Sequence, residues 1–145
     1  MGQQQLLLVI LVTIIVGIAT VVAINTFSSS ADSANLDAVR NDVAAIAAAA
    51  QGYYLKPTML GGGGNTFTGV TFNTIAFAGD STSSDFLTAT NSNGKYVIGT
   101  VTASSFVVTS HPASRITGGV TLSATASNTL AATVSESSIT WSDNN

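Results

Sequence analysis

The chain opens on a long apolar run. Across residues 6–24 every residue is apolar except Thr13, Gly17 and Thr20, and the first charged residue is Asp32. At about 1.5 Å rise per residue, a helix over this run is roughly 28 Å long, enough to cross the hydrocarbon core of a bilayer. A helix that is apolar on every side needs lipid or other protein around it.

The apolar pattern resumes after a mostly polar stretch at 25–30, now with helical spacing. Apolar positions recur at intervals of three and four, which places them on one helix face: Leu36, Val39, Val43, Ile46, Ala50 and Tyr53. Charged and amide residues are expected on the remaining faces: Asp32, Asp37, Arg40, Asn41 and Asp42. The sequence therefore predicts one helix from Leu6 to about Gln51, with Gly52 as its C-cap and Pro57 preventing continuation.

From Pro57 onward, short runs rich in Thr, Val, Ile and Phe alternate with Gly, Ser and Asn, which is typical of strands. The predicted strands are 71–78, 86–90, 95–102, 105–110, 119–125, 130–135 and 138–141. The segment 91–94 ends in Asn-Gly and predicts a hairpin. The expected fold class is α+β, with an antiparallel sheet packed on the amphipathic half of the helix.

The four glycines at 61–64 predict a flexible loop. A phosphate-binding loop would continue into Lys-Ser/Thr and a helix, but here Asn65, Thr66 and Phe67 lead into strand-like sequence.

Composition excludes several functions. Only 8% of the residues are charged, against about 25% in typical soluble domains. The four basic residues are scattered, so no nucleic-acid partner is expected. Cysteine is absent, which removes thiolate chemistry and disulfides.

Residues that could support catalysis or metal binding are few. The single histidine, His111, precedes Pro112 and is expected to be an exposed turn residue. Asp80 and Asp85 lack the spacing of a calcium loop, and no nucleophile motif occurs. We therefore expect no enzyme activity, no metal and no cofactor.

The apolar run has three alternative roles. A cleaved signal peptide is disfavoured, because no basic residue precedes the run and the run is longer than a signal core. A membrane anchor and the dry centre of an assembly remain. The close helix approach that an assembly needs is favoured by Gly17 and Ala19.

These features together resemble the type IV pilin family. The resemblance rests on the apolar run at 6–24 with Gly17 inside it, the amphipathic stretch at 35–51 and the β-rich remainder. It implies that a leader peptidase cuts the precursor, that the new N-terminal amine is methylated, and that the apolar helices bundle into a helical filament.

The family usually has phenylalanine at mature position one and glutamate at position five. If Met1 is the mature start and the methylated residue, the fifth position is Gln5, whose amide can hydrogen-bond a neighbour's amine. A cut after Gly2 would make Gln3 the first residue instead.

The expected organisation is an apolar helix over 1–27, an amphipathic helix over 28–52 and a β-rich head over 53–145. The expected function is a subunit of an extracellular, cell-surface filament, with a membrane-inserted precursor. Its partners would be further copies of itself, the inner membrane and the pilus assembly machinery. The alternative is a minor pseudopilin of a secretion system or a single-pass membrane-anchored surface domain. The expected assembly interface comprises Gln5, Leu6, Leu7, Leu8, Ile10, Leu11, Ile14, Ile15, Gly17, Ile18, Val21 and Val22.

Overall fold

The computed structural model describes residues 2–116 and 129–144. By its internal contacts the chain divides into two units, Met1–Ala34 and Asn35–Asn145. The helix α1 (Gly2–Leu55) contributes its first part to one unit and its last part to the other. The prediction of a long N-terminal helix is confirmed.

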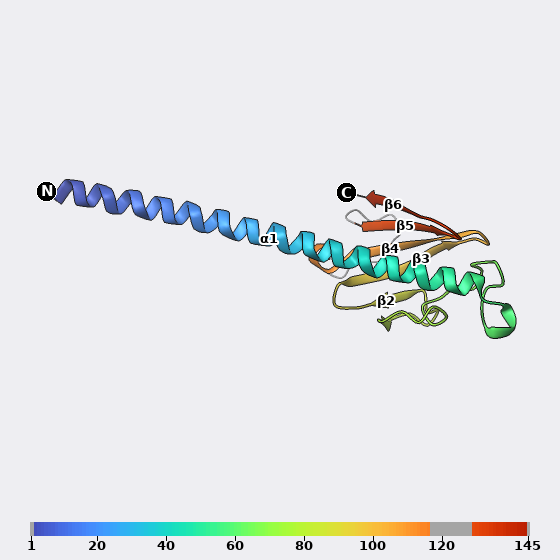
Figure 1. Cartoon of the computed structure of the whole chain (residues 1–145). Helices are drawn as coiled ribbons and strands as arrows, with labels where there is room; N and C mark the ends of the chain where they lie inside the picture. Colours follow the sequence, from blue (N-terminus) through green and yellow to red (C-terminus); the bar gives the residue numbers. More distant parts are fainter. Residues whose placement is uncertain (1, 117–128, 145) are drawn as a thin grey trace. The chain divides into compact units, whose positions relative to one another are not determined.

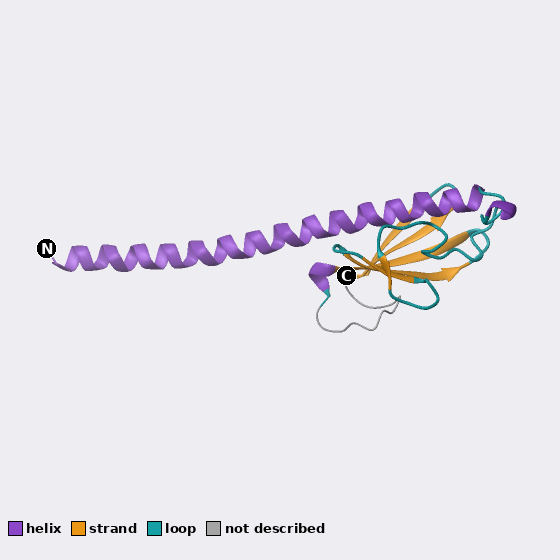
Figure 2. Ribbon diagram, turned by 90° about the horizontal axis from the view of Figure 1, so that it is seen from below, coloured by secondary structure: helices purple, strands orange, loops and turns teal. Residues whose placement is uncertain are grey.

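The second unit contains a six-stranded sheet in which every strand pairs antiparallel with its neighbour along the chain (Figure 1). Its strands are β1 (Asp80–Ser81), β2 (Thr88–Thr90), β3 (Gly94–Val101), β4 (Ser105–Pro112), β5 (Thr129–Ser135) and β6 (Ile139–Asn144). Two short 3-10 helices, η1 (Thr58–Leu60) and η2 (Ala113–Arg115), follow α1 and β4. The last turns of α1 pack on one face of the sheet (Figure 2), which confirms the α+β class.

The core lies between that face and α1. The helix buries Val39, Val43, Ile46, Ala47 and Ala50, four of which belong to the predicted stripe. The sheet contributes large side chains that alternate along its central strands: Tyr96, Ile98, Phe106, Val108, Leu130 and Val134. Buried side chains at every second strand position therefore pack against buried side chains at every third or fourth helix position, and together they form one apolar layer.

Three strand predictions need correction or lie outside the described residues. Segment 71–78 is not a strand but a series of turns, in which Thr71 and Thr74 bond one another's backbone and Phe72 and Ile75 enter the core. The predicted strand 86–90 shortens to β2, because Phe86 has a positive φ of 54°. Segment 119–125 falls in the part of the chain that is not described.

The predicted C-cap at Gly52 is wrong, because α1 continues through it to Leu55. The glycine loop ends the helix instead. Gly63 N donates to Tyr53 O at 2.8 Å, and Gly64 N donates to Lys56 O at 2.9 Å. The loop was expected to be flexible, but it is a hydrogen-bonded cap whose N–H groups are already engaged with backbone carbonyls.

Candidate functional site

The first part of α1 exposes a continuous apolar surface. Its large apolar side chains between Leu6 and Ile24 are all exposed, from 48% at Val12 to 69% at Leu7. Within the described residues α1 is long and apolar enough to span a membrane, and none of its most apolar window is buried by the chain itself.

The predicted interface residues all lie in this part of α1, and each of them is exposed: Gln5, Leu6, Leu7, Leu8, Ile10, Leu11, Ile14, Ile15, Gly17, Ile18, Val21 and Val22. They include consecutive positions, so they occupy all sides of the helix rather than one stripe. Met1 lies outside the described residues. A Cβ added at Gly17 would meet nothing within 4 Å, so the glycine leaves open space at the helix surface.

The hydroxyl groups within this surface are satisfied by the helix itself. Thr13 Oγ1 donates to Ile10 O at 2.8 Å, and Thr20 Oγ1 donates to Val16 O at 2.8 Å. Thr26 Oγ1 similarly donates to the carbonyl four residues earlier, at 2.9 Å. Since a buried hydroxyl without a partner costs free energy, these bonds make the segment compatible with a dry surrounding.

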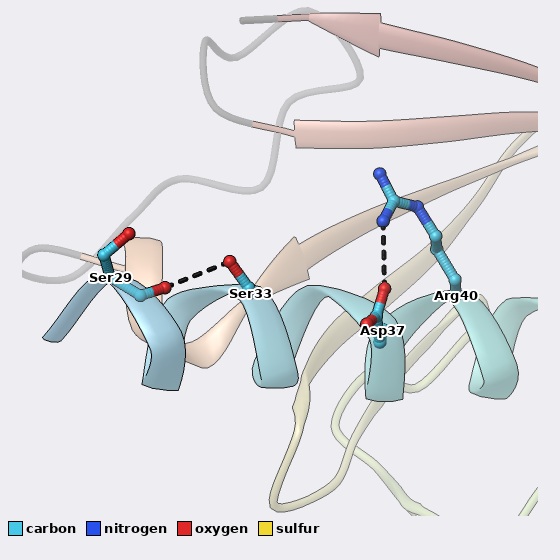
Figure 3. Close-up of polar contacts among 4 residues, drawn as sticks. All are labelled: Ser29, Ser33, Asp37 and Arg40. Atoms are coloured by element: carbon cyan, nitrogen blue, oxygen red, sulfur yellow. Dashed lines mark hydrogen bonds and ion pairs between the residues drawn. The ribbon is translucent and has the colours of Figure 1, made fainter. Parts of the chain in front are cut away.

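Farther along α1 the exposed side chains become polar (Figure 3). Ser33 Oγ donates to Ser29 O at 3.0 Å, again within the helix. Arg40 and Asp37 form an exposed ion pair at 3.2 Å. An exposed pair of this kind adds little stability, but it marks a surface that water solvates well.

The exposed apolar area is too large for the protein to be a stable monomer in water. A helix over residues 6–24 exposes on the order of a thousand Å² of apolar surface, worth roughly tens of kcal/mol at about 25 cal/mol per Å². A monomer with this surface in water would be highly unfavourable. The surface must be covered by lipid, by other chains or by both in turn.

The second unit contains a polar cluster that the sequence did not reveal. The Asp42 cluster consists of Asp42 on α1, Asn91 and Asn93 in the β2–β3 turn, and Tyr96 on β3. One oxygen, Asp42 Oδ2, accepts hydrogen bonds from Tyr96 Oη at 2.6 Å, Asn93 Nδ2 at 2.7 Å and Asn91 Nδ2 at 2.8 Å. The sequence predicted that Asp42 would lie outside the apolar stripe of the helix, on a polar face. In the structure its hydrogen bonds fix the helix to the hairpin.

Hydrogen bonding sets the charge state of this cluster. Burial alone would raise the pKa of Asp42, but the bonds from Tyr96, Asn93 and Asn91 together outweigh it and lower the pKa below 3.8. Burial and the bond to Asp42 raise the pKa of Tyr96 well above its usual value. The cluster therefore holds a carboxylate and a neutral phenol at neutral pH.

The expectation that His111 is an exposed turn residue is wrong. Strand β4 continues through Pro112, and His111 is only 4% exposed. Its Nε2 and the Oγ1 of buried Thr109 have no hydrogen-bond partner among the described residues. No group of three potential metal ligands occurs within the described part of the chain, so His111 is not part of such a group there.

Acid should destabilise the second unit in two stages. Burial, with a smaller contribution from Lys95, lowers the pKa of His111 below 6.5, so the unfolded chain takes up a proton first and stability falls as pH drops below 6.5. Asp42 has a lowered pKa too, so its contribution is full above 3.8 and is lost as pH falls below that value. Thermal unfolding of the detergent-solubilised chain across this range measures both stages.

Two variants test whether His111 causes the upper stage and Asp42 the lower stage. His111→Gln should remove the upper stage and leave the lower one, whereas Asp42→Asn should weaken the lower stage alone. An upper stage that persists in His111→Gln would contradict the assignment.

Comparisons with known proteins identified no relative of this chain. No family model matches the chain, and neither the curated proteins nor the solved structures gave a match.

Proposed function

We propose that this protein is a structural subunit that polymerises through residues 6–24 of α1 into a type IV pilus-like filament on the cell surface. In this proposal the same segment lies in the membrane before assembly and in the centre of the filament afterwards. The subunit has no catalytic role, and its partners are further copies of itself and the machinery that assembles them.

The single observation that carries the proposal is the exposure of apolar side chains on every side of residues 6–24 of α1. A lipid anchor and a filament core both cover such a surface. Packing between several identical helices covers it without lipid, and a head-to-tail contact that does not close generates a filament.

Two further features support polymerisation. The open surface at Gly17 leaves room for a neighbouring helix to approach closely. The β-rich part of the chain is poor in charge and rich in hydroxyl groups, with 31 Ser and Thr among the 89 residues from Pro57 onward. This composition suits a subunit that is repeated many times at a surface, because like charges do not accumulate along the polymer.

A single-pass membrane anchor is the second candidate, and the length and apolarity of α1 favour it as well. The two candidates differ in what happens when lipid and detergent are removed. A filament subunit then associates through its helices into long polymers, whereas an anchored monomer aggregates without order or stays in the membrane fraction.

The test is assembly of the purified full chain after detergent removal, followed by sedimentation and electron microscopy. We expect filaments from the unaltered chain and none from Ile15→Asp, because an unpaired carboxylate in the dry centre costs several kcal/mol per subunit. Ser30→Asp is the matched control, since it adds the same charge at an exposed polar position of the same helix.

Two outcomes would contradict the proposal. One is the absence of filaments from the unaltered chain together with stable monomers in vesicles, which would favour the anchor. The other is normal filament yield from Ile15→Asp, which would show that residues 6–24 do not form the centre.

A further inference from the structure

A reactive dipeptide lies inside the Asp42 cluster. Asn93 and Gly94 form the only Asn-Gly pair of the chain. In such a pair the glycine nitrogen can attack Cγ of the asparagine, because glycine has no Cβ to hinder the approach and its backbone adopts many conformations. The N–Cγ bond forms, the Cγ–Nδ2 bond breaks, and Nδ2 leaves as ammonia with the proton of the glycine nitrogen. Water then opens the cyclic imide to aspartate or isoaspartate.

In the folded chain the attacking nitrogen and the leaving nitrogen both donate hydrogen bonds. Gly94 N, the attacking atom, donates to Asn91 Oδ1 at 3.1 Å. Asn93 Nδ2, the leaving atom, donates to Asp42 Oδ2 at 2.7 Å. The side chain of Asn93 is thus held by α1 while the glycine nitrogen is held by the turn.

The backbone of Asn93 is fixed as well. Its carbonyl oxygen accepts from Asn35 Nδ2 at 2.9 Å and from Ala113 N at 2.8 Å, and its N–H donates to Asn91 Oδ1 at 2.9 Å. A Cβ added at Gly94 would lie 2.3 Å from His111 O, so the neighbouring strand leaves little room there. Ring closure needs rotation about the bonds of Asn93, and these contacts oppose it.

We propose that Asn93–Gly94 is a latent deamidation site that the Asp42 cluster holds closed. The site reacts only when the part of α1 that carries Asn35 and Asp42 separates from the β2–β3 turn.

The product of the reaction opposes closure of the cluster. Deamidation replaces the amide donor of Asn93 by a carboxylate next to Asp42 Oδ2. Two carboxylates at that distance repel each other, so at neutral pH the cluster re-forms only against this repulsion or by taking up a proton on one of them. A chain that has opened and reacted therefore closes less readily than an unreacted one.

The test measures the deamidation rate at residue 93 by peptide mapping of the full chain in detergent at mildly alkaline pH. A free peptide of residues 90–96 serves as the unprotected reference. We expect the folded chain to react about tenfold more slowly or slower still, because the site must first open locally. A folded chain that reacts as fast as the peptide would overturn the proposal.

Asp42→Asn and Val43→Ala separate local opening from general instability. Asp42→Asn removes the charge that accepts three hydrogen bonds, and we expect about a tenfold faster reaction than in the unaltered chain. Val43→Ala destabilises the core without touching the cluster. Equal acceleration in both variants, compared at the same fraction unfolded, would show that the cluster gives no specific protection.

Asn93→Asp tests the second half of the proposal, since it creates the aspartate product directly. We expect a lower melting temperature than in the unaltered chain at neutral pH, and a smaller difference once acid neutralises one of the two carboxylates. A melting temperature equal to that of the unaltered chain at neutral pH would show that deamidation does not weaken closure.

Discussion

Val43→Asp is expected to unfold the second unit. Val43 is fully buried in the helix–sheet layer, and no lysine or arginine is buried in the part of the chain that the structure describes. A carboxylate there is either unpaired or protonated at a high cost, about 3 kcal/mol or more, which is a large part of the stability of a small domain. Loss of the cooperative thermal transition, followed through the signal of Trp141, measures the effect.

Ala44→Asp is the matched control for this variant. Residue 44 is the next position on the same helix, but it is exposed. The same carboxylate there should change the free energy of unfolding by no more than about 0.5 kcal/mol. A normal transition in Val43→Asp would show that this face of α1 does not pack on the sheet.

Gly63→Ala is expected to destabilise the second unit by about 2 kcal/mol or more, as overpacking of a rigid site does. A Cβ on residue 63 would lie 1.9 Å from Thr66 O and 2.9 Å from a ring carbon of Tyr53. The clash is with backbone, so rotation of a side chain cannot relieve it. The loop would have to move and release the carbonyls at the end of α1. Chemical denaturation of the detergent-solubilised chain measures the loss.

Gly52→Ala provides the comparison, because a Cβ at this helical position meets nothing within 4 Å. Alanine restricts the unfolded chain and favours the helix, so this variant should gain roughly 0.5 to 1 kcal/mol. Equal effects of the two substitutions would contradict the role of the glycine loop as a cap.

The sequence predicted the helix well because its signal is local. Apolar positions at intervals of three and four define the buried face whatever lies opposite, and Val39, Val43 and Ile46 are buried as expected. Strands β3 to β6 were also predictable, since they are rich in β-branched and aromatic residues, which favour strands.

The predictions were wrong where the structure is determined by contacts between residues distant in sequence, or by hydrogen bonds of side chains to the nearby backbone, rather than by the local pattern. Segment 71–78 is rich in Thr, Phe and Ile like a strand, yet its buried Phe72 and Ile75 are three residues apart and threonine hydroxyls stabilise turns instead. The role of Asp42 depends on residues about fifty positions away, whose register no local pattern discloses. His111 was misjudged because Pro112 ends β4 rather than interrupting it, a position where a strand tolerates proline.

The order of the strands has a consequence for how the chain acquires its structure. Each strand pairs with the next one along the chain, so the sheet can grow by successive hairpins with small loop-closure entropy. The contacts of α1 with the sheet span much longer separations, as between Asp42 and Tyr96. We therefore expect hairpin pairing to form the transition state and docking of the helix to follow it, so that core substitutions on α1 accelerate unfolding more than they slow folding.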